Sequence, residues 1–164
     1  MAETQLVVFR LGMGQYAASI NRVREILRPV RVARMPRVAP FVRGLFNLRG
    51  QVLPLLDTKA RLGLPAAPPA PAGGAPRDAK ARVMVVEAAG ESIGLMVDEV
   101  LEVLRCEESA LQAPRNVLDL PGRHFLSSVL DLDGRLVLEL DLERLVEGAA
   151  DAEAGLAPGL GAGI

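Results

Sequence analysis

The chain carries one sequence pattern twice. The segment Val-Arg-Glu-Ile-Leu-Arg at residues 23–28 returns 77 positions later, at residues 100–105, as Val-Leu-Glu-Val-Leu-Arg. Residues 47–57 return 84 positions later, at residues 131–141, with Asn-Leu-Arg-Gly replaced by Asp-Leu-Asp-Gly. Two repeats in the same order predict two similar halves, and a groove between the halves is then a candidate binding site. Chance similarity between apolar strands is the alternative explanation.

Short apolar runs joined by turn residues predict an all-β fold with short helices. Four hairpins are expected, with strands at residues 5–11 and 15–19, 45–48 and 51–57, 82–87 and 91–97, and 125–132 and 135–140. We expect one or two helical turns at residues 23–27, although the same spacing suits a strand, and a strand or helical turn at 100–104. A short edge strand is expected at 30–33, and short helices at 58–62 and from Asp141 to Glu147. Four hairpins without long helices predict two small β-barrels rather than an α/β fold.

The composition divides the chain into four parts. Residues 1–62 form the predicted first subdomain and residues 82–147 the second, which ends in a helix. Residues 63–81 are rich in Pro, Ala and Gly and predict a connector, and residues 148–164 predict a flexible tail. Exchange of strands between the halves is left open. The lack of a long apolar run or signal region predicts a cytoplasmic protein.

The charges are distributed unevenly. Residues 1–62 hold eleven basic and three acidic residues, a net charge of +8, whereas residues 82–164 hold six arginines and sixteen acids, a net charge of −10. One face can therefore steer acidic partners and the other basic ones. A dense arginine series raises the alternative of nucleic-acid binding; it comprises Arg22, Arg24, Arg28, Arg31, Arg34 and Arg37. Scarce aromatic residues and the acidic second half argue against that alternative.

The residue inventory argues against an enzyme. His124 is the only histidine and Cys106 the only cysteine, so nucleophilic triads and zinc sites lack partners. Asp131 and Asp133 flank a predicted turn, whose geometry Asp favours. Residues 12–14 lack the third glycine of a dinucleotide site. We predict a non-enzymatic binding module without cofactor or metal.

Glu25 and Arg49 are the charged residues that most suggest a partner contact. Glu25 lies inside the apolar turn expected at residues 23–27, and Arg49 lies at a hairpin tip between two apolar runs. If partly buried, each requires an opposite charge. Exposure of both side chains to solvent is the alternative.

A series of motifs in the same order resembles the CheW family of bacterial chemotaxis adaptors. The first half contains Phe-Arg-Leu-Gly at 9–12, Val-Arg-Glu-Ile at 23–26, Arg-Gly-Leu-Phe-Asn-Leu-Arg-Gly at 43–50 and Val-Leu-Pro-Leu-Leu-Asp at 52–57. The second half adds Gly-Leu-Met-Val-Asp-Glu-Val at 94–100 and Asp-Gly-Arg-Leu-Val-Leu at 133–138. The resemblance extends from about residue 5 to residue 147.

This resemblance implies two SH3-like β-barrel subdomains and a scaffold in receptor arrays at the inner membrane. The scaffold would couple the cytoplasmic tips of methyl-accepting chemoreceptors to the regulatory domain of a CheA-type histidine kinase, with other CheW-like domains in rings as a further partner. The implied receptor-binding groove comprises Val23, Glu25, Ile26, Asn47, Arg49, Gly50, Val97 and Val100. Arg43 and Gly44 are the implied kinase contacts. A CheW-like scaffold of a non-flagellar pathway, such as surface motility, is the main alternative.

The chain departs from the family pattern in two places. Ser127 and Ser128 occupy a strand start that usually contains glycine, and residues 65–76 are unusually rich in proline. The two copies also differ from each other, because Asp133 stands where the first copy has Arg49, and we expect it to face Glu102. Recognition is therefore expected to be concentrated in the first half.

Overall fold

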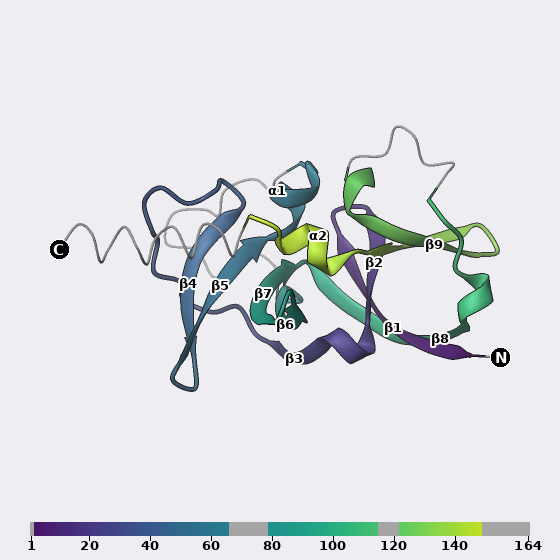
Figure 1. The fold of residues 1–164 in the computed structure, drawn as a ribbon, viewed down its shortest axis with the longest axis horizontal. Coiled ribbons are helices and arrows are strands. Elements are labelled where there is room, and N and C mark those ends of the chain that lie inside the picture. The colour runs from purple at the N-terminus through teal and green to yellow at the C-terminus, as the bar shows by residue number, and fades with distance from the viewer. Residues whose placement is uncertain (1, 66–78, 115–121, 149–164) are drawn as a thin grey trace.

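The computed structural model describes residues 2–65, 79–114 and 122–148, which form mainly β structure (Figure 1). The strands are β1 (Glu3–Leu11), β2 (Gly14–Ser19), β3 (Val23–Leu27), β4 (Val42–Leu48), β5 (Gln51–Asp57), β6 (Arg82–Ala88), β7 (Glu91–Val97), β8 (Glu99–Glu107), β9 (Leu126–Leu132) and β10 (Arg135–Leu140). The helices are α1 (Thr58–Leu62) and α2 (Leu142–Val146), with 3-10 turns η1 (Ile20–Arg22), η2 (Glu108–Ala110) and η3 (Arg123–Phe125). The predicted all-β class and the four hairpins are confirmed.

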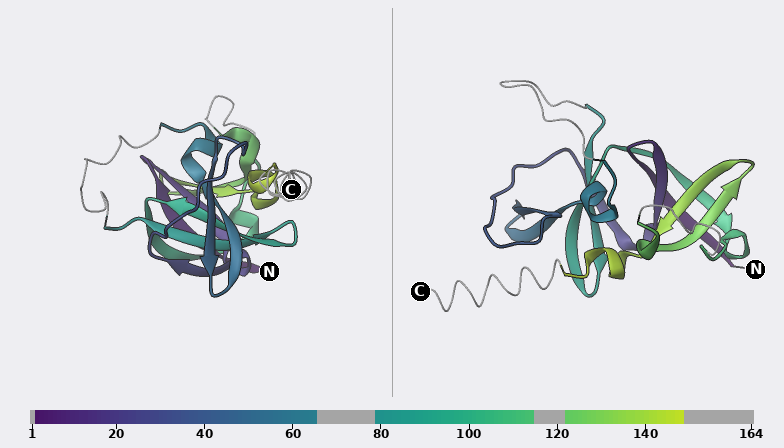
Figure 2. Two further views of the ribbon diagram at one scale, coloured as in Figure 1. Left: turned by 90° about the vertical axis from the view of Figure 1, so that its left-hand side faces the viewer. Right: turned by 90° about the horizontal axis from the view of Figure 1, so that it is seen from above.

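The strands form two five-stranded sheets with the same topology. The order of the first sheet is β8-β1-β2-β10-β9 and that of the second is β3-β6-β7-β5-β4. Each strand of the first sheet has its repeat-related strand at the same place in the second. One parallel pair, β2–β10 or β5–β7, joins the two hairpins of each sheet. The duplication seen in the sequence is therefore a duplication of the fold, and the two sheets lie side by side along the long axis (Figures 1 and 2).

Each sheet combines strands from both halves of the sequence. The hairpin β1–β2 pairs with β8 and β10, and the hairpin β6–β7 pairs with β3 and β5. The sheets do not coincide with the predicted ranges 1–62 and 82–147, because the opening hairpin of each half is exchanged. Strand exchange leaves the hairpins unchanged, so hydrophobic periodicity, which is local, does not reveal it.

Some local predictions differ from the structure. Residues 23–27 are strand β3 rather than a helix, because pairing with β6 satisfies their backbone groups along a sheet edge. Residues 30–33 form only an isolated bridge, between Ala33 and Leu45. Residues 100–104 belong to β8. Most of the predicted connector and nearly all of the predicted tail lie outside the described residues.

Among the described residues, three apolar clusters make up the core. Leu6 and Val8 of β1 belong to a cluster within the first sheet, whereas Val7 and Phe9 face a larger cluster shared by both sheets. Strand β6 repeats this arrangement, with a third cluster within the second sheet. Because successive side chains in a strand point to opposite faces, β1 and β6 are buried on both sides. This double burial explains why their sequences are continuously apolar.

Helix α1 is tied to helix α2 by one arginine. Arg61 Nε donates to the carbonyl oxygen of Leu145 at 2.8 Å, and Arg61 Nη2 donates to that of Glu147 at 2.7 Å. The guanidinium carbon lies 4.2 Å from the ring centroid of Phe41 and 4.6 Å from that of Phe125. Phe41 and Phe125 are themselves 84 positions apart in the sequence, at matching places in the two copies. Arg61 thus joins equivalent parts of the two halves through hydrogen bonds and cation–π contacts.

Candidate functional site

The tip of the β4–β5 hairpin is shaped by its turn residues. Arg49 and Gly50 both have positive φ, 50° and 87°, as a two-residue type I′ turn requires. The Asn47 side-chain oxygen accepts a hydrogen bond of 2.9 Å from the Gly50 N–H. Asn47 and Gly50 therefore hold the turn in the conformation that presents the Arg49 side chain.

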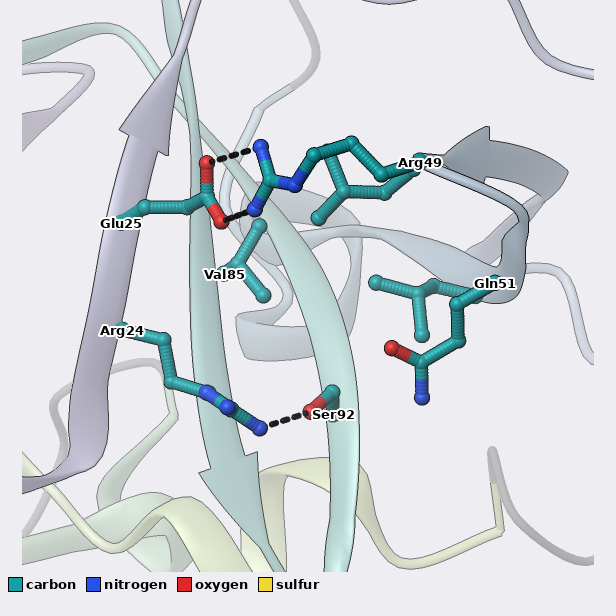
Figure 3. A pocket seen from close by; sticks show the side chains of 8 residues that line it. Arg24, Glu25, Arg49, Gln51, Val85 and Ser92 are labelled. Carbon is teal, nitrogen blue, oxygen red and sulfur yellow. Dashed lines mark hydrogen bonds and ion pairs between the residues drawn. The ribbon is translucent and has the colours of Figure 1, made fainter.

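Arg49 extends across to strand β3 and binds Glu25 with both terminal nitrogens (Figure 3). The Nη1–Oε1 distance is 3.2 Å, and Nη2 donates to Oε2. The Glu25 side chain is 28% exposed and that of Arg49 is 70% exposed. The two charged residues singled out in the sequence thus bind each other, and a bidentate contact fixes the orientation better than a single one does. The pair lies at the surface where a partner can reach it.

Arg49 keeps the Glu25 carboxyl group ionised at neutral pH. The hydrogen bond from Arg49 is the largest influence on Glu25 and lowers the pKa of its carboxyl group, and the charges of Arg49 and Arg24 act in the same direction. Desolvation opposes them. The Glu25 carboxylate is consequently ionised throughout the neutral range and remains a strong acceptor.

A small hollow lies beside the pair, with charged walls and an apolar floor. It has a volume of about 190 Å³ and is lined by Arg24, Glu25, Leu48, Arg49, Gln51, Leu53, Val85 and Ser92. Leu53 and Val85 are buried and form its floor. Pockets for small molecules usually measure about 300–1,000 Å³, so this hollow suits one or two side chains of a protein partner better than a cofactor.

Val23, Ile26 and Asn47 lie on the other face of the second sheet. Ile26 pairs with Met84 of β6, whose side chain belongs to the shared core, so Ile26 points toward the side where the two sheets meet. Val23 packs partly buried against the same core, whereas Ile26 is 43% exposed. Asn47 pairs with Val52, which is 54% exposed. Exposed apolar side chains thus lie on the face of the second sheet opposite to the Glu25–Arg49 pair.

The second-half members of the predicted groove are less accessible. Val97 is 3% exposed and belongs to the shared core, so it offers no surface to a partner. Val100 is half-buried against the same core. We therefore leave Val97 out of the proposed contact surface and retain Val100 at its edge.

The two residues predicted to contact a kinase have different surroundings. The side chain of Arg43 is 51% exposed, with its Nε atom 3.9 Å from Asp57 Oδ2. Gly44 has φ +148°, and a Cβ there would lie 2.3 Å from the Ala33 carbonyl oxygen. Gly44 is thus required for the close approach of Ala33 and Arg34 to β4, a structural reason that the sequence alone does not reveal.

Several residues of the site were not predicted from the sequence. Arg24 donates hydrogen bonds to Glu87 at 3.0 Å and to Ser92 at 3.2 Å, and forms one wall of the hollow. Gln51 also lines the hollow, and Val52 supplies exposed apolar surface. The sequence gives one indication that Val52 is exposed. It is a β-branched residue next to a polar hairpin tip, so it fits the strand pattern without facing the core.

The repeat-related place in the first sheet corrects one prediction. Glu102 does not face Asp133; it accepts a hydrogen bond of 2.6 Å from Arg135 Nη2. Arg135 corresponds to Gln51, two positions beyond Arg49 in the repeat. Both sheets therefore carry a Glu–Arg pair, and the exposed Val103 and Leu136 match Ile26 and Val52. The expectation that Glu102 faces an acidic residue is wrong, because its partner Arg135 lies two positions beyond the place that matches Arg49.

The part of the chain that the structure describes shows neither a metal cluster nor a membrane-spanning helix. Within it, no group of three or more His, Cys, Asp or Glu side chains is arranged to hold a metal ion. None of its helices has the length and apolar character needed to cross a bilayer.

Known proteins resemble this chain over most of its length. A family model described as CheW-like domain matches residues 5–150. The Chemotaxis protein CheW of Rhizobium meliloti is 31% identical over 139 residues, which cover 85% of this chain and 84% of that protein. The scaffolding protein TtCheW from Thermoanaerobacter tengcongensis has a crystal structure that matches with a TM-score of 0.76 and 29% identity, over 89% of this chain and 94% of that one. Protein PilI of Pseudomonas aeruginosa is 35% identical over 92 residues, covering 56% of this chain and 47% of that protein.

Proposed function

Because this chain belongs to the CheW family, we propose that it acts as a chemotaxis adaptor that couples chemoreceptor tips to a CheA-type histidine kinase. The adaptor is non-enzymatic and works in the cytoplasm, where receptor arrays at the inner membrane recruit it. Its partners are the cytoplasmic tips of methyl-accepting chemoreceptors, the regulatory domain of the kinase, and other CheW-like domains in rings.

The receptor-binding surface of this proposal is centred on the Glu25–Arg49 pair. The observation that carries it is the ordered and accessible Glu25–Arg49 pair at the β3 edge, where the next residue along the strand, Ile26, exposes an apolar side chain on the opposite face. An amphipathic receptor helix would lay its apolar face on Ile26 and the adjoining edge of Val23 and Val100. A polar residue of the helix would meet Arg49, whose side chain is 70% exposed. The apolar contact supplies affinity and the charged pair supplies specificity.

The test is a titration of the folded protein with a fluorescent receptor-tip fragment. Arg49→Ala should weaken binding by about tenfold, the effect of losing one charge-assisted contact at an interface. Arg135→Ala is the matched control, because it removes the arginine of the corresponding Glu–Arg pair in the first sheet. We expect it to change the affinity less than about twofold. Equal affinities of wild type and folded Arg49→Ala would contradict the proposed site.

For kinase binding we propose Arg43, with Gly44 acting through the backbone geometry it permits. Arg43→Ala should weaken binding of the kinase regulatory domain without changing receptor binding, because the half-exposed Arg43 side chain has only a long contact with Asp57. Loss of kinase binding and receptor binding together would indicate a general folding defect and would contradict a specific role of Arg43.

A scaffold for a non-flagellar pathway remains the second candidate. Beside the chemotaxis proteins, the chain is also similar to a protein whose name does not mention chemotaxis, PilI, over 56% of its length. Affinity capture from the native cytoplasm separates the two candidates, since recovery of chemoreceptors together with a kinase supports the first. Recovery of a kinase without chemoreceptors supports the second.

A further inference from the structure

Four arginines between β3 and β4 have no assigned role. The segment of residues 28–40 carries Arg28, Arg31, Arg34 and Arg37, all exposed. Nearer the start of β3, Arg22 binds Glu143 at 2.8 Å and Arg24 binds Glu87 at 3.0 Å. None of the residues that the structure describes forms an ion pair with the four arginines of the segment. They are a concentrated and uncompensated positive charge.

This arginine segment, residues 28–40, is held firmly against the second sheet. Ala33 and Leu45 exchange two backbone hydrogen bonds, of 2.8 and 2.9 Å. Val30 and Val32 pack against the core cluster within the second sheet, and Val38 packs against the shared core. The apolar residues thus anchor the segment, while the arginines between them remain in solvent.

The arginines recur at every third residue. An extended chain spans at most about 3.3–3.6 Å per residue, so successive arginines are separated by up to roughly 10 Å along the segment. This distance is close to the Debye length of about 8 Å at physiological ionic strength, which limits their mutual repulsion. The spacing suits several separate carboxylates better than one small anion.

Strand exchange concentrates positive charge around this segment. Residues 23–97, which supply all strands of the second sheet, hold twelve basic and five acidic residues, a net charge of +7. Residues 1–22 and 98–147, which supply the first sheet, hold seven arginines and thirteen acidic residues, a net charge of −6. The two sheets lie at opposite ends of the long axis (Figure 1). The charge difference between the sheets therefore acts as a dipole along the molecule.

This polarity discriminates between classes of polyanion. A long nucleic acid extends beyond the segment and would also meet the acidic first sheet, which repels it, whereas contact of an anionic membrane with the basic end alone is an outcome of the test below. Residues 28–40 contain no aromatic side chain on which a base could stack. A short acidic stretch of polypeptide contacts the arginines alone. We propose that the arginine segment is a docking site for an acidic segment of a partner protein, separate from the receptor surface proposed above.

Fluorescence anisotropy with a labelled 16-residue peptide of alternating Glu and Ser tests this proposal. The double variant Arg31→Gln/Arg34→Gln should weaken peptide binding at least about fivefold, since two exposed charge pairs are lost. The matched control is Arg105→Gln/Arg123→Gln, which removes the same charge from two exposed arginines of the acidic side. It should weaken binding less than about twofold. Receptor-tip binding should be unchanged in both variants, which separates this site from the proposed function.

Three outcomes would overturn the proposal. One is an equal loss of peptide binding in the two double variants, which would show attraction to net charge without a site. Another is failure of the wild-type protein to bind the peptide at low salt. The third is tighter binding of a single-stranded RNA 16-mer, or of phosphatidylglycerol vesicles, with the same dependence on Arg31 and Arg34.

Discussion

The cores within the two sheets fill equivalent space with different pairs of side chains. In the second sheet Gly94 lies against Phe46, and a Cβ on Gly94 would come within 2.7 Å of the Phe46 ring and 3.0 Å of Val83 Cγ1. In the first sheet the repeat-related residues are Ala17 and Leu130, which belong to one buried cluster. A large residue therefore faces glycine in one sheet, and a smaller residue faces alanine in the other. We predict that these two positions are energetically coupled.

The substitution Gly94→Ala tests this coupling. The added methyl group clashes with a ring that is 3% exposed, and overpacking of this kind costs about 1–3 kcal/mol. Loss of glycine's flexibility in the unfolded chain offsets about 0.4–1 kcal/mol. We expect a net loss of about 1–2 kcal/mol in the free energy of unfolding. Phe46→Leu alone should also cost about 1–2 kcal/mol, because it leaves unfilled space.

The double variant Gly94→Ala/Phe46→Leu recreates the pair found in the first sheet. It should lose no more than about 1 kcal/mol relative to the wild type, so that the coupling energy is favourable by about 1–4 kcal/mol. Urea unfolding followed by circular dichroism measures all four proteins, and unchanged m values would show that the same surface unfolds. If the two losses simply add in the double variant, or if Gly94→Ala is as stable as the wild type, the argument from equivalent cores is refuted.

Two further predictions concern the arginines that join distant parts of the chain. Arg61→Ala should lower the free energy of unfolding by about 2 kcal/mol, because it removes the contacts with Leu145, Glu147 and the two phenylalanine rings. Arg61→Lys should restore little of this loss, since an ammonium group cannot donate along a planar fork, and urea unfolding beside the exposed Arg105→Ala is the measurement. For the surface pair, Arg49 lowers the pKa of Glu25 below its ordinary value of 4.5. The stabilisation of the fold by the Glu25–Arg49 pair is therefore complete above pH 4.5, and it is lost as the pH falls through the lowered pKa. NMR titration of the Glu25 carboxyl should show its pKa rising toward 4.5 in Arg49→Ala; an unchanged midpoint would contradict the pairing.

Hairpins and caps could be predicted because their signals are local. Asp133-Gly134 marks a turn in which both residues have positive φ, and Asp57 and Asp141 each accept a backbone hydrogen bond at the start of a helix. Glu25 and Arg49 could be singled out because each lies among apolar residues, but their contact with each other and the 70% exposure of Arg49 are seen only in the structure. Each of these inferences depends on a few neighbouring residues.

Strand β3 was harder to predict because its short apolar pattern fits two structures. Val23, Ile26 and Leu27 have helical spacing, yet pairing with β6 makes them an edge strand. Such an outcome depends on a neighbour some 60 residues away in the sequence. The partner of Glu102 was missed for a related reason, since sequence alignment placed Asp133 opposite it whereas the folded hairpin brings Arg135 there.

The sequence by itself determined that the chain is duplicated, mainly β, and similar in its motifs to CheW proteins, because these properties are written in local patterns and their repetition. The tertiary structure alone decided which hairpin joins which sheet. An arrangement with exchanged hairpins and one without exchange contain the same hairpins and the same apolar faces, so only long-range strand pairing distinguishes them. That choice places the basic residues 23–97 in one sheet unit and the acidic remainder in the other, and it leaves the arginine segment exposed beside β4.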